Sequence, residues 1–548
     1  MLPIRLQGLD GLPRGPVLKN RHPFSPVGAR RRDRPRLAGR RPPGRAGEPR
    51  ARRGRARADG PGLPRGPVGL PARGPRRRDP GPGAGAHVRR RARALARGWH
   101  RGDRAGLPRP RREVASPVSR AAGEQALAAI GEDRPTAHVT VFDEPIVDAE
   151  EGPLTGHSLA VKDNLALAGQ PLTCASRILA DHQAPFTATV VERAGRAGAA
   201  IVSKANMDEF ACGSRGERSA YGATDNPAQP GTVPGGSSSG CAAALAAGHV
   251  DLALGTDTGG SVRCPAAYCG VAGLKPTRGR MSRWGLVDLA MSLDQPGPMA
   301  ATTEGLARLY DAIAGPDPED PTTIEDEPEP ALERVRSPDL RDARLGVPDE
   351  LPEAVSEGVR ERFQAAVDRL RDEVSDVREI AMPDSQRALS AYYVTCYAEF
   401  ASAMHKFDGT VFGTPGQASR RDLGREVKRR ILLGTFITAR ENRSAWYDRA
   451  RGARHRLVRD WQGLFADVDL VLTPTMPTVP PERGQDPSPL EESAADVLTV
   501  HANLAGLPAG TVPTEPLPGG PVGLQITAPS GEDARVLEAM SLHEEASA

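Results

Sequence analysis

The sequence predicts an α/β protein built around a β-sheet. Four short apolar segments read as strands, at residues 137–142, 159–161, 200–203 and 252–254. Helical patterns lie between them, since residues 188–198 are amphipathic and residues 241–247 are rich in alanine. Strands that alternate with helices in this way are typical of proteins in which helices cover a sheet.

The C-terminal half continues with the same kinds of element. Residues 316–338 are rich in proline and acidic residues and are expected to form a surface loop or linker. Beyond them, apolar residues at helical spacing predict a long amphipathic helix through Val355, Val359, Phe363, Val367, Leu370 and Val374. A second helical stretch covers about residues 439–465, and a buried strand is expected at residues 468–472.

Charge divides the 548-residue chain into two unlike parts. Residues 1–115 contain 32 Lys and Arg against 7 Asp and Glu, a net charge of +25, whereas residues 116–548 contain 41 against 62, a net charge of −21. The first part is rich in Arg, Pro and Gly and has no apolar periodicity, so we expect it to be disordered. It is either a basic arm that contacts RNA phosphates or the product of an out-of-frame stretch of GC-rich DNA, and the abrupt change of charge favours the second explanation. The globular domain is expected at residues 116–548.

Composition also excludes several classes of protein. No apolar run approaches the ~18 residues that a membrane span needs, and the N-terminus lacks the apolar core of a signal peptide. The six cysteines form no CxxC pair, and no cluster of histidines completes a zinc spacing. We therefore expect a cytoplasmic protein with reduced cysteines, no metal site and no contact with a membrane.

Two Gly/Ser-rich turns lie close together in the sequence, at residues 234–240 (PGGSSSG) and 255–263 (GTDTGGSVR). Glycines let the backbone approach a ligand closely, and successive N–H groups in such a turn can bind an anion. Neither turn matches the motif of a nucleotide P-loop. The G-x-S-x-G pattern at residues 236–240 is also discounted, because a hydrolase elbow of that kind needs a strand directly before it and the preceding prolines argue against one.

A serine nucleophile in these turns needs a base. No histidine lies in either turn, and His157 and His249 are expected at the surface. Lys162 is the better candidate, because it ends the apolar strand at residues 159–161, where burial would lower its pKa from ~10.4 and leave the amine neutral. The alternative is a structural lysine in a salt bridge, for example with Asp163, and the residues alone leave both readings open.

With these residues in view, the sequence resembles the amidase signature family. The resemblance rests on residues 160–164 (AVKDN) together with the two Gly/Ser-rich turns. Members of that family use a Ser–cis-Ser–Lys triad whose serines lie 24 positions apart, which is the spacing of Ser237 and Ser261. The resemblance implies that Ser261 is the nucleophile, Ser237 the relay serine and Lys162 the base. It also implies a cis peptide bond between Gly236 and Ser237.

The same resemblance implies the amidase-signature fold, a central mixed β-sheet covered by helices on both faces, over about residues 136–530. It places the oxyanion hole at the backbone N–H groups of Thr258, Gly259 and Gly260. Three places depart from the family pattern. Ser239 stands where the family usually has glycine, and Cys241 where it usually has serine. Residues 400–405 differ from the Ala/Ser/Asn-rich sequence that the family usually has there.

Further segments resemble one branch of the family, the A subunits of glutamyl/aspartyl-tRNA amidotransferases. They are residues 204–210 (KANMDEF), 268–277 (YCGVAGLKPT), 282–286 (SRWGL), 292–295 (SLDQ), 426–431 (EVKRRI), 503–508 (NLAGLP) and 523–526 (GLQI). The substrate in that branch is glutamine. The resemblance implies that Arg430 binds its α-carboxylate and Asp496 its α-ammonium group, with Tyr392 as a further contact.

The resemblance therefore implies the glutaminase subunit of a tRNA-dependent amidotransferase. Its ammonia would convert Glu-tRNA(Gln) to Gln-tRNA(Gln), Asp-tRNA(Asn) to Asn-tRNA(Asn), or both. The implied partners are the B and C subunits of a heterotrimer, in which a partner subunit uses ATP and Mg, and no cofactor is expected in this chain. Two other functions stay open: a stand-alone amidase acting on another small amide, and an RNA-binding protein acting through residues 1–115.

Overall fold

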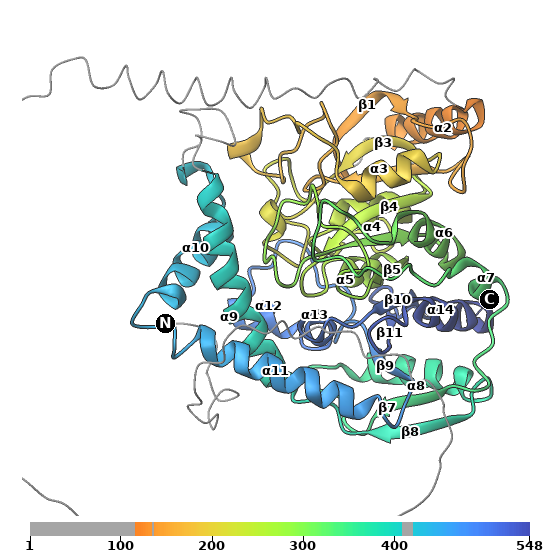
Figure 1. Ribbon diagram of the computed structural model, residues 1–548, viewed down its shortest axis with the longest axis vertical. Coiled ribbons are helices and arrows are strands. Elements are labelled where there is room, and N and C mark those ends of the chain that lie inside the picture. Colours follow the sequence, from red (N-terminus) through yellow and green to blue (C-terminus); the bar gives the residue numbers. More distant parts are fainter. Residues whose placement is uncertain (1–115, 134–135, 408–419, 548) are drawn as a thin grey trace, which may run out of the picture. The chain divides into compact units, whose positions relative to one another are not determined.

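A mixed β-sheet of eleven strands runs through the part of the chain that the structure describes. The structure is a computed structural model, and it describes residues 116–133, 136–407 and 420–547. The expectation of a disordered basic segment at residues 1–115 falls outside the described residues. The strand order is β1-β3-β2-β4-β6-β5-β10-β11-β9-β7-β8 (Figure 1).

Both parallel and antiparallel pairs occur in this sheet. Strand β2 is parallel to both of its neighbours, β3 and β4, and β7 is parallel to β8 and β9, whereas the remaining pairs are antiparallel. The mixed sheet expected from the sequence is therefore confirmed. The strands are β1 (His138–Ile146), β2 (Ser158–Lys162), β3 (Ala200–Ala205), β4 (Leu252–Asp257), β5 (Ala272–Lys275), β6 (Gln295–Ala300), β7 (Arg344–Pro348), β8 (Asp376–Ile380), β9 (Leu470–Pro474), β10 (Ala509–Pro513) and β11 (Gly523–Thr527).

Helices follow or separate most of the strands. They are α2 (Pro117–Asp133), α3 (Thr189–Arg196), α4 (Ser239–Ala246), α5 (Arg263–Cys269), α6 (Thr303–Ile313), α7 (Leu332–Arg336), α8 (Glu357–Arg371), α9 (Ser385–Ala403), α10 (Arg425–Thr438), α11 (Tyr447–Leu464), α12 (Pro489–Ala494), α13 (Val500–Ala505) and α14 (Asp533–Ser547).

Side chains of β2 show that helices cover both faces of the sheet. Leu159 and Val161 belong to a core cluster that includes α3, α6, α8 and α14, whereas Ala160 belongs to a second cluster with α2, α4 and α5. Successive residues of a strand point to opposite faces, so these two clusters lie on opposite sides of the sheet. The same alternation puts Lys162 on the face of Ala160, where α4 packs.

A third core cluster joins α9, α11 and α13 to the strands Leu470–Pro474 and Ala509–Pro513. Figure 1 shows α9, α10 and α11 standing together beside this part of the sheet. These helices carry two of the three residues expected to bind substrate, Tyr392 on α9 and Arg430 on α10.

Two sequence-based expectations differ in detail from the structure. The stretch 316–338, expected to be a loop, contains the short helix α7, and the helical stretch expected at 439–465 begins only at Tyr447. All six cysteines are free and buried. None of the helices in the described ranges is both long and apolar enough to cross a membrane.

Candidate active site

Lys162 lies at the end of β2, and its side chain is completely buried. Its Nζ lies within hydrogen-bonding distance of three hydroxyls: Ser237 Oγ at 2.8 Å, Ser238 Oγ at 2.8 Å and Thr256 Oγ1 at 2.9 Å. The two serines come from the turn before α4, and Thr256 lies on β4, the parallel neighbour of β2. The sheet and the turn thus bring three separate segments to one buried amine.

The hydrogen bonds of Ser238 distinguish it from Ser237. Ser238 Oγ donates to the carbonyl of Thr256 and accepts from the N–H of Thr256, both at 3.2 Å. Because its proton is engaged, Ser238 can only accept from Lys162. Within the described residues, Ser237 Oγ has Lys162 as its one hydrogen-bond partner, so its proton is free to move to the lone pair of a neutral amine. Ser239 lies away from the lysine, with its Oγ 3.0 Å from Thr224 Oγ1.

The surroundings of Lys162 favour the neutral amine. Burial lowers the pKa of Lys162 from 10.5 to about 8, although Cys241 and the carboxylates of Asp208 and Asp257 act in the opposite direction. An amine with this pKa is partly neutral near pH 7 and can accept a proton, as a general base must.

The alternative role for Lys162, a salt bridge with Asp163, does not occur in the structure. Asp163 pairs instead with Lys204, at 3.3 Å between Nζ and Oδ1, and both side chains are fully buried. Asp163 also accepts hydrogen bonds from the N–H and the hydroxyl of Thr173. No ion pair involves Lys162 among the described residues, so the lysine is held by hydroxyls and not by a carboxylate.

The turn that carries Ser237 lies directly beside the turn that carries Ser261. The Ser238 N–H donates to the Ser261 carbonyl at 3.1 Å. The Gly236–Ser237 peptide bond is cis, as expected. Gly235 has φ of 78°, and a Cβ there would lie 2.8 Å from the backbone of Pro265, so this position requires glycine. Ser261 is 9% exposed, and its hydroxyl has no hydrogen bond to any described residue, which leaves it available to a substrate.

The Asp257 carboxylate stabilises the turn around Ser261 through hydrogen bonds to its backbone. It accepts from the N–H of Gly260 at 2.8 Å and of Val262 at 3.2 Å, and from two nitrogens of the buried Arg263. The Gly260 N–H is therefore engaged inside the turn, so the expectation that it donates to an oxyanion is not supported. No described residue accepts from the N–H groups of Thr258 and Gly259, the other two groups expected at the oxyanion hole.

Asp294 also supports this turn, through a contact that the sequence did not predict. Thr258 Oγ1 donates to Asp294 Oδ1 at 2.6 Å, and Asp294 Oδ2 accepts from the N–H groups of Leu289 and Ala290. Burial raises the pKa of Asp294 to about 7. The only sequence signal for Asp294 is the segment 292–295 (SLDQ), which resembles the amidotransferase branch but indicates no role for its aspartate.

Two of the residues expected to bind substrate lie against the serine-bearing turn. Tyr392 packs so closely over Gly259 that a Cβ there would lie 2.3 Å from the tyrosine Oη. Asp496 belongs to a segment tied to the turn by Thr499, whose hydroxyl donates to the Gly259 carbonyl at 2.6 Å. The hydroxyl of Tyr393, which the sequence did not single out, donates to Asp496 Oδ2 at 2.5 Å. Burial raises the pKa of Asp496 to about 7, and the Tyr393 hydrogen bond opposes that rise.

Arg430, the third of these residues, is held from two helices. Its Nε donates to Glu426 Oε1, one turn earlier on α10, at 2.7 Å, and Nη1 approaches Cys396 Sγ on α9 at 3.7 Å. Its guanidinium carbon lies 5.8 Å from the centre of the Tyr397 ring. The positive charge of Arg430 lowers the pKa of Asp496. The two groups expected to bind the α-carboxylate and the α-ammonium group therefore attract one another electrostatically.

One expectation about histidine was wrong. His249 is buried, because its ring packs against that of His138 on β1, with 5.6 Å between the ring centres. In the described ranges, no group of three His, Cys, Asp or Glu side chains is arranged to hold a metal ion.

Comparison with protein families gives one match that covers most of the chain. The model of a family described as Amidase matches residues 131–537. That range contains the whole sheet and every residue placed in the candidate active site.

Curated proteins with similar sequences belong to amidotransferases. The chain is 46% identical over 414 residues to the A subunit of glutamyl-tRNA(Gln) amidotransferase from Natronomonas pharaonis, across 73% of this chain and 98% of that protein. It is 46% identical over 405 residues to the protein of the same name from Thermus thermophilus, across 72% of this chain and 86% of that protein.

Solved structures with this fold include enzymes with different substrates. The A subunit of glutamyl-tRNA(Gln) amidotransferase from Thermotoga maritima superposes with a TM-score of 0.68 at 36% identity, covering 77% of this chain and 90% of that one. A 6-aminohexanoate cyclic dimer hydrolase, complexed with substrate, superposes with a TM-score of 0.69 at 26% identity, covering 78% and 93%. The fold is equally similar in both cases, whereas the sequence is closer to the amidotransferase.

Proposed function

The chain belongs to the amidase family, and on this premise we propose that it is the glutaminase subunit of a tRNA-dependent amidotransferase. The observation that carries the hydrolytic chemistry is the buried amine of Lys162, 2.8 Å from Ser237 Oγ and beside the turn that bears Ser261. The identity of 46% over 98% of an amidotransferase A subunit supports glutamine as the substrate.

In the proposed reaction, protons move from Ser261 to Ser237 and from Ser237 to the neutral amine of Lys162. Ser261 Oγ attacks the side-chain amide carbon of glutamine, and the N–H groups of Thr258 and Gly259 donate to the oxyanion. A donor of this kind is typically worth about 3 kcal/mol. The proton returns through Ser237 to the leaving nitrogen, and ammonia departs. Water then attacks the γ-glutamyl ester through the same relay, which releases glutamate and restores the Ser261 hydroxyl.

The α-groups of glutamine are proposed to lie between Arg430 and Asp496. A guanidinium donates to a carboxylate through two parallel N–H groups, so Arg430 suits the α-carboxylate. Asp496 accepts from the α-ammonium group, and its partner Tyr393 leaves one carboxylate oxygen for that purpose. Tyr392 bounds the space next to Gly259. These contacts set the distance between the site that binds the α-groups and the Ser261 hydroxyl. They therefore favour glutamine over shorter amides.

The released ammonia needs a partner that uses it. We propose that the chain works with B and C subunits in a heterotrimer that acts in the cytoplasm. In that complex a partner subunit uses ATP and Mg to activate the mischarged Glu-tRNA(Gln) or Asp-tRNA(Asn). The chain itself supplies glutaminase chemistry from its own side chains and needs no cofactor.

The test is co-expression of the chain with candidate B and C subunits, followed by glutamine-dependent amidation of Glu-tRNA and Asp-tRNA measured separately. We expect ATP-dependent formation of Gln-tRNA or Asn-tRNA, and loss of ammonia release in the Ser261→Ala complex. A complex that assembles but leaves glutamine intact, while hydrolysing another small amide, would instead identify a stand-alone amidase.

A further inference from the structure

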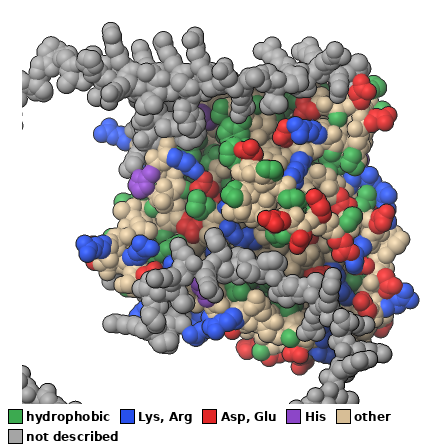
Figure 2. All heavy atoms as spheres, in the orientation of Figure 1, with side chains coloured by type: hydrophobic (Ala, Val, Ile, Leu, Met, Phe, Trp, Pro, Cys, Tyr) green, Lys and Arg blue, Asp and Glu red, His purple; other side chains and the backbone are tan. Residues whose placement is uncertain are grey.

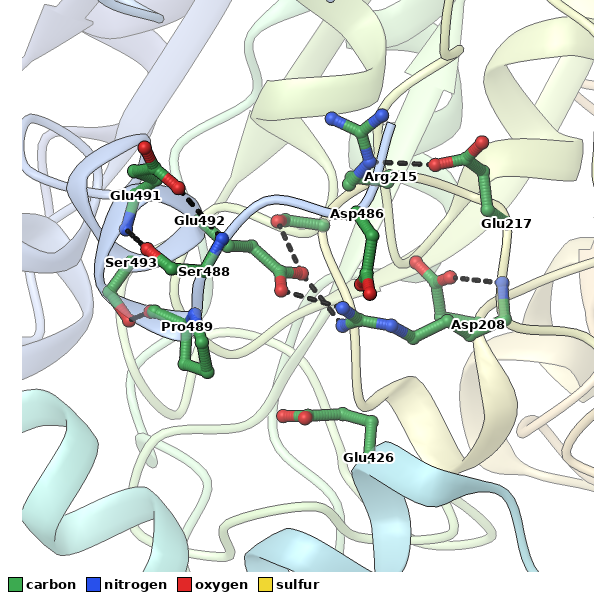
Figure 3. Close-up of polar contacts among 12 residues, drawn as sticks. Asp208, Arg215, Glu217, Glu426, Asp486, Ser488, Pro489, Glu491, Glu492 and Ser493 are labelled. Carbon is green, nitrogen blue, oxygen red and sulfur yellow. Dashed lines mark hydrogen bonds and ion pairs between the residues drawn. The ribbon is translucent and has the colours of Figure 1, made fainter. Parts of the chain in front are cut away.

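Arg218 and Glu492 form a two-pronged ion pair between segments that lie far apart in the chain. The Arg218 Nη1 lies 2.7 Å from Glu492 Oε1, and Nη2 lies 2.6 Å from Oε2. Ser214 Oγ donates to the same carboxylate at 3.4 Å. The side chains are 29% and 12% exposed, so the pair is largely shielded from water. In Figure 3 the Glu492 side chain reaches away from α12, toward the loop that carries Asp208 and Arg215.

On the arginine side, the pair is attached to the backbone of the relay serine. The Asp208 carboxylate accepts from the N–H groups of Gly216 and Arg218, each at 3.0 Å, and the Glu209 N–H donates to the Arg218 carbonyl at 2.7 Å. The Asp208 N–H donates in turn to the Ser237 carbonyl at 3.3 Å. Arg218 is therefore fixed to the framework that holds the proposed relay.

On the glutamate side, the pair is attached to the segment that carries Asp496. Glu492 lies on α12, whose N-terminus has a capping box between Ser488 and Glu491. The chain then turns so that the Asp496 N–H donates to the Ser493 carbonyl, and Thr499 binds both the Asp496 carbonyl and the Gly259 carbonyl. Asp496 thus lies between two fixed points, Glu492 before it and Thr499 after it.

We propose that the Arg218–Glu492 pair positions Asp496 to bind the α-ammonium group of the substrate, so that both residues act as positioning residues for glutamine. The inference rests on the proposed glutaminase function. Thr499 already holds one end of the segment on the turn with Ser261, and the ion pair holds the other end on the framework of Ser237. Together they set the distance between the carboxylate that receives the ammonium group and the serines that act on the amide.

The charges around the pair explain why its loss affects binding more than turnover. Figure 3 also shows Glu426 on α10, the residue that pairs with Arg430. Without Arg218, the Glu492 carboxylate loses its paired cation and still acts on the buried Asp208, so α12 is expected to move away. That movement displaces Asp496 but leaves the hydrogen bonds of Lys162, Ser237 and the Ser261 turn in place.

The experiment exchanges the two charges in the chain assembled with its B and C subunits. We expect R218E and E492R each to raise the KM for glutamine about tenfold or more with kcat nearly unchanged, since displacing a substrate-positioning group acts on this scale. The double variant R218E/E492R restores the pair in reverse and is expected to return KM toward the wild-type value. If charge reversal prevents folding, R218Q and E492Q replace it, with a rise in KM of the same direction expected.

A matched control is the pair Arg344–Asp469, which is also two-pronged, joins distant segments and is 33% and 26% exposed. Its exchanged variants R344E and D469R are expected to leave the KM for glutamine unchanged. The positioning role would be overturned if R218E and E492R had the wild-type KM for glutamine. It would also be overturned if the double variant R218E/E492R did not lower the raised KM of the single variants.

Hydrogen–deuterium exchange separates this inference from the proposed function, because it needs no substrate. We expect faster exchange over residues 488–499 in R218E and E492R and wild-type exchange in the double variant. If the wild-type complex fails to hydrolyse glutamine while exchange follows this pattern, the glutaminase proposal fails and the positioning of Asp496 stands for whatever substrate is used. Unchanged exchange in the single variants contradicts the positioning role in either case.

Discussion

At the scale of single residues, burial alone does not make a lysine into a base. Lys275 is as buried as Lys162, and its pKa is lowered further, to about 7, but its one hydrogen bond among the described residues is to the Pro276 carbonyl. Lys204 donates to the carbonyls of Leu165 and Pro171 and pairs with Asp163. Lys162 differs because a hydroxyl with a free proton, that of Ser237, lies within its reach.

The pH dependence of the reaction tests this role. We expect kcat/KM for glutamine to rise with pH and to level off above about pH 8, because Lys162 is protonated and cannot accept a proton below its pKa of about 8. A lysine with its ordinary pKa of 10.5 would place that rise more than two pH units higher. Ammonia release by the assembled complex between about pH 6 and about pH 10 measures it.

The control for the pH profile is Lys162→Arg, which should lose about 10²–10⁴-fold in kcat/KM because arginine is not neutral at these pH values. Exposed Lys428→Arg should behave like the wild type. A flat profile, or a Lys162→Arg enzyme of nearly full activity, would remove Lys162 from the relay.

Tyr393 gives a second prediction at this scale. Tyr393→Phe removes the donor to Asp496, so the pKa of Asp496 should rise above about 7 and less of the carboxylate should be ionised at neutral pH. We expect the KM for glutamine at pH 7 to rise about tenfold, the scale of a hydrogen bond to a charged group, with kcat little changed. Raising the pH should recover part of the loss. A Tyr393→Phe enzyme with wild-type KM at every pH would show that this hydroxyl has no part in binding.

The residues that sequence could identify are those whose identity and spacing carry the chemistry. Lys162, Ser237 and Ser261 lie in three short motifs at fixed separation, and the structure brings their segments together. Tyr393 could not be separated from Tyr392 in the sequence, because neighbouring residues of a helix differ only in the direction in which they point, and packing decides which one meets Asp496. Asp294 and the Arg218–Glu492 pair depend on contacts between segments far apart in the chain, which no local pattern records.

At the scale of elements, β6 is the clearest case in which local pattern misleads. Its sequence contains Pro296 and Pro298, and proline usually argues against a strand inside a sheet because it has no N–H to donate. The two prolines occupy alternate positions, so their missing N–H groups fall on one side of the strand. Pairing with β5 begins only at Met299, so the prolines leave no partner unpaired there. The full pairing with β4 compensates for them.

The packing of α10 on α9 gives the prediction for this scale. At Gly434 on α10, a Cβ would lie 1.8 Å from the Tyr397 carbonyl and 2.6 Å from Ala401 Cβ on α9. Gly434→Ala must therefore push the helices apart, which should destabilise the fold by about 1–3 kcal/mol. Because α10 carries Arg430, the KM for glutamine should rise as well. Thermal unfolding and glutaminase kinetics measure the two effects.

Gly463, on α11, provides the comparison. Nothing lies within 4 Å of a Cβ at this position, so Gly463→Ala should leave KM unchanged and stabilise the helix by up to about 1 kcal/mol. Equal behaviour of the two alanine variants would mean that the contact between α9 and α10 does not position Arg430.

At the scale of the whole molecule, the sheet is assembled from strands that are distant in sequence. Ala509 of β10 pairs with Lys275 of β5, and β9 joins β11 to β7. The sequence indicated strands near 137–142, 159–161, 200–203, 252–254 and 468–472, and each is present. It did not indicate their order, because apolar pattern identifies a strand but not its neighbour.

The charge asymmetry of the chain leads to a prediction about its two parts. We propose that residues 116–548 form the complete catalytic domain, since the candidate site draws only on that part. A chain that begins at Ser116 should assemble with its partner subunits and hydrolyse glutamine at the wild-type rate. Loss of activity on truncation would contradict this division of the chain.

RNA binding distinguishes the two explanations for residues 1–115. If they form a basic arm, the full chain should bind RNA without sequence preference, and truncation should abolish that binding. The logarithm of the binding constant of the full chain should fall by about 0.7 per log unit of salt concentration for each phosphate contacted. Figure 2 shows acidic and basic side chains mixed over the visible face of the described part, with no single basic surface. Equal RNA affinity with and without the segment would argue against an arm.

The burial of Lys162, Lys204 and Lys275 has a practical consequence for mapping the assembly. Reagents that cross-link amines need accessible lysines, and within the described residues only Lys406 and Lys428 reach the surface. Lys406 follows α9 and Lys428 lies on α10, so both belong to the helical part of the domain that also carries Tyr392 and Arg430. Any lysine cross-link from this domain to another protein of the complex must therefore report on that one region. Carboxylate-directed reagents, in contrast, would sample the whole surface.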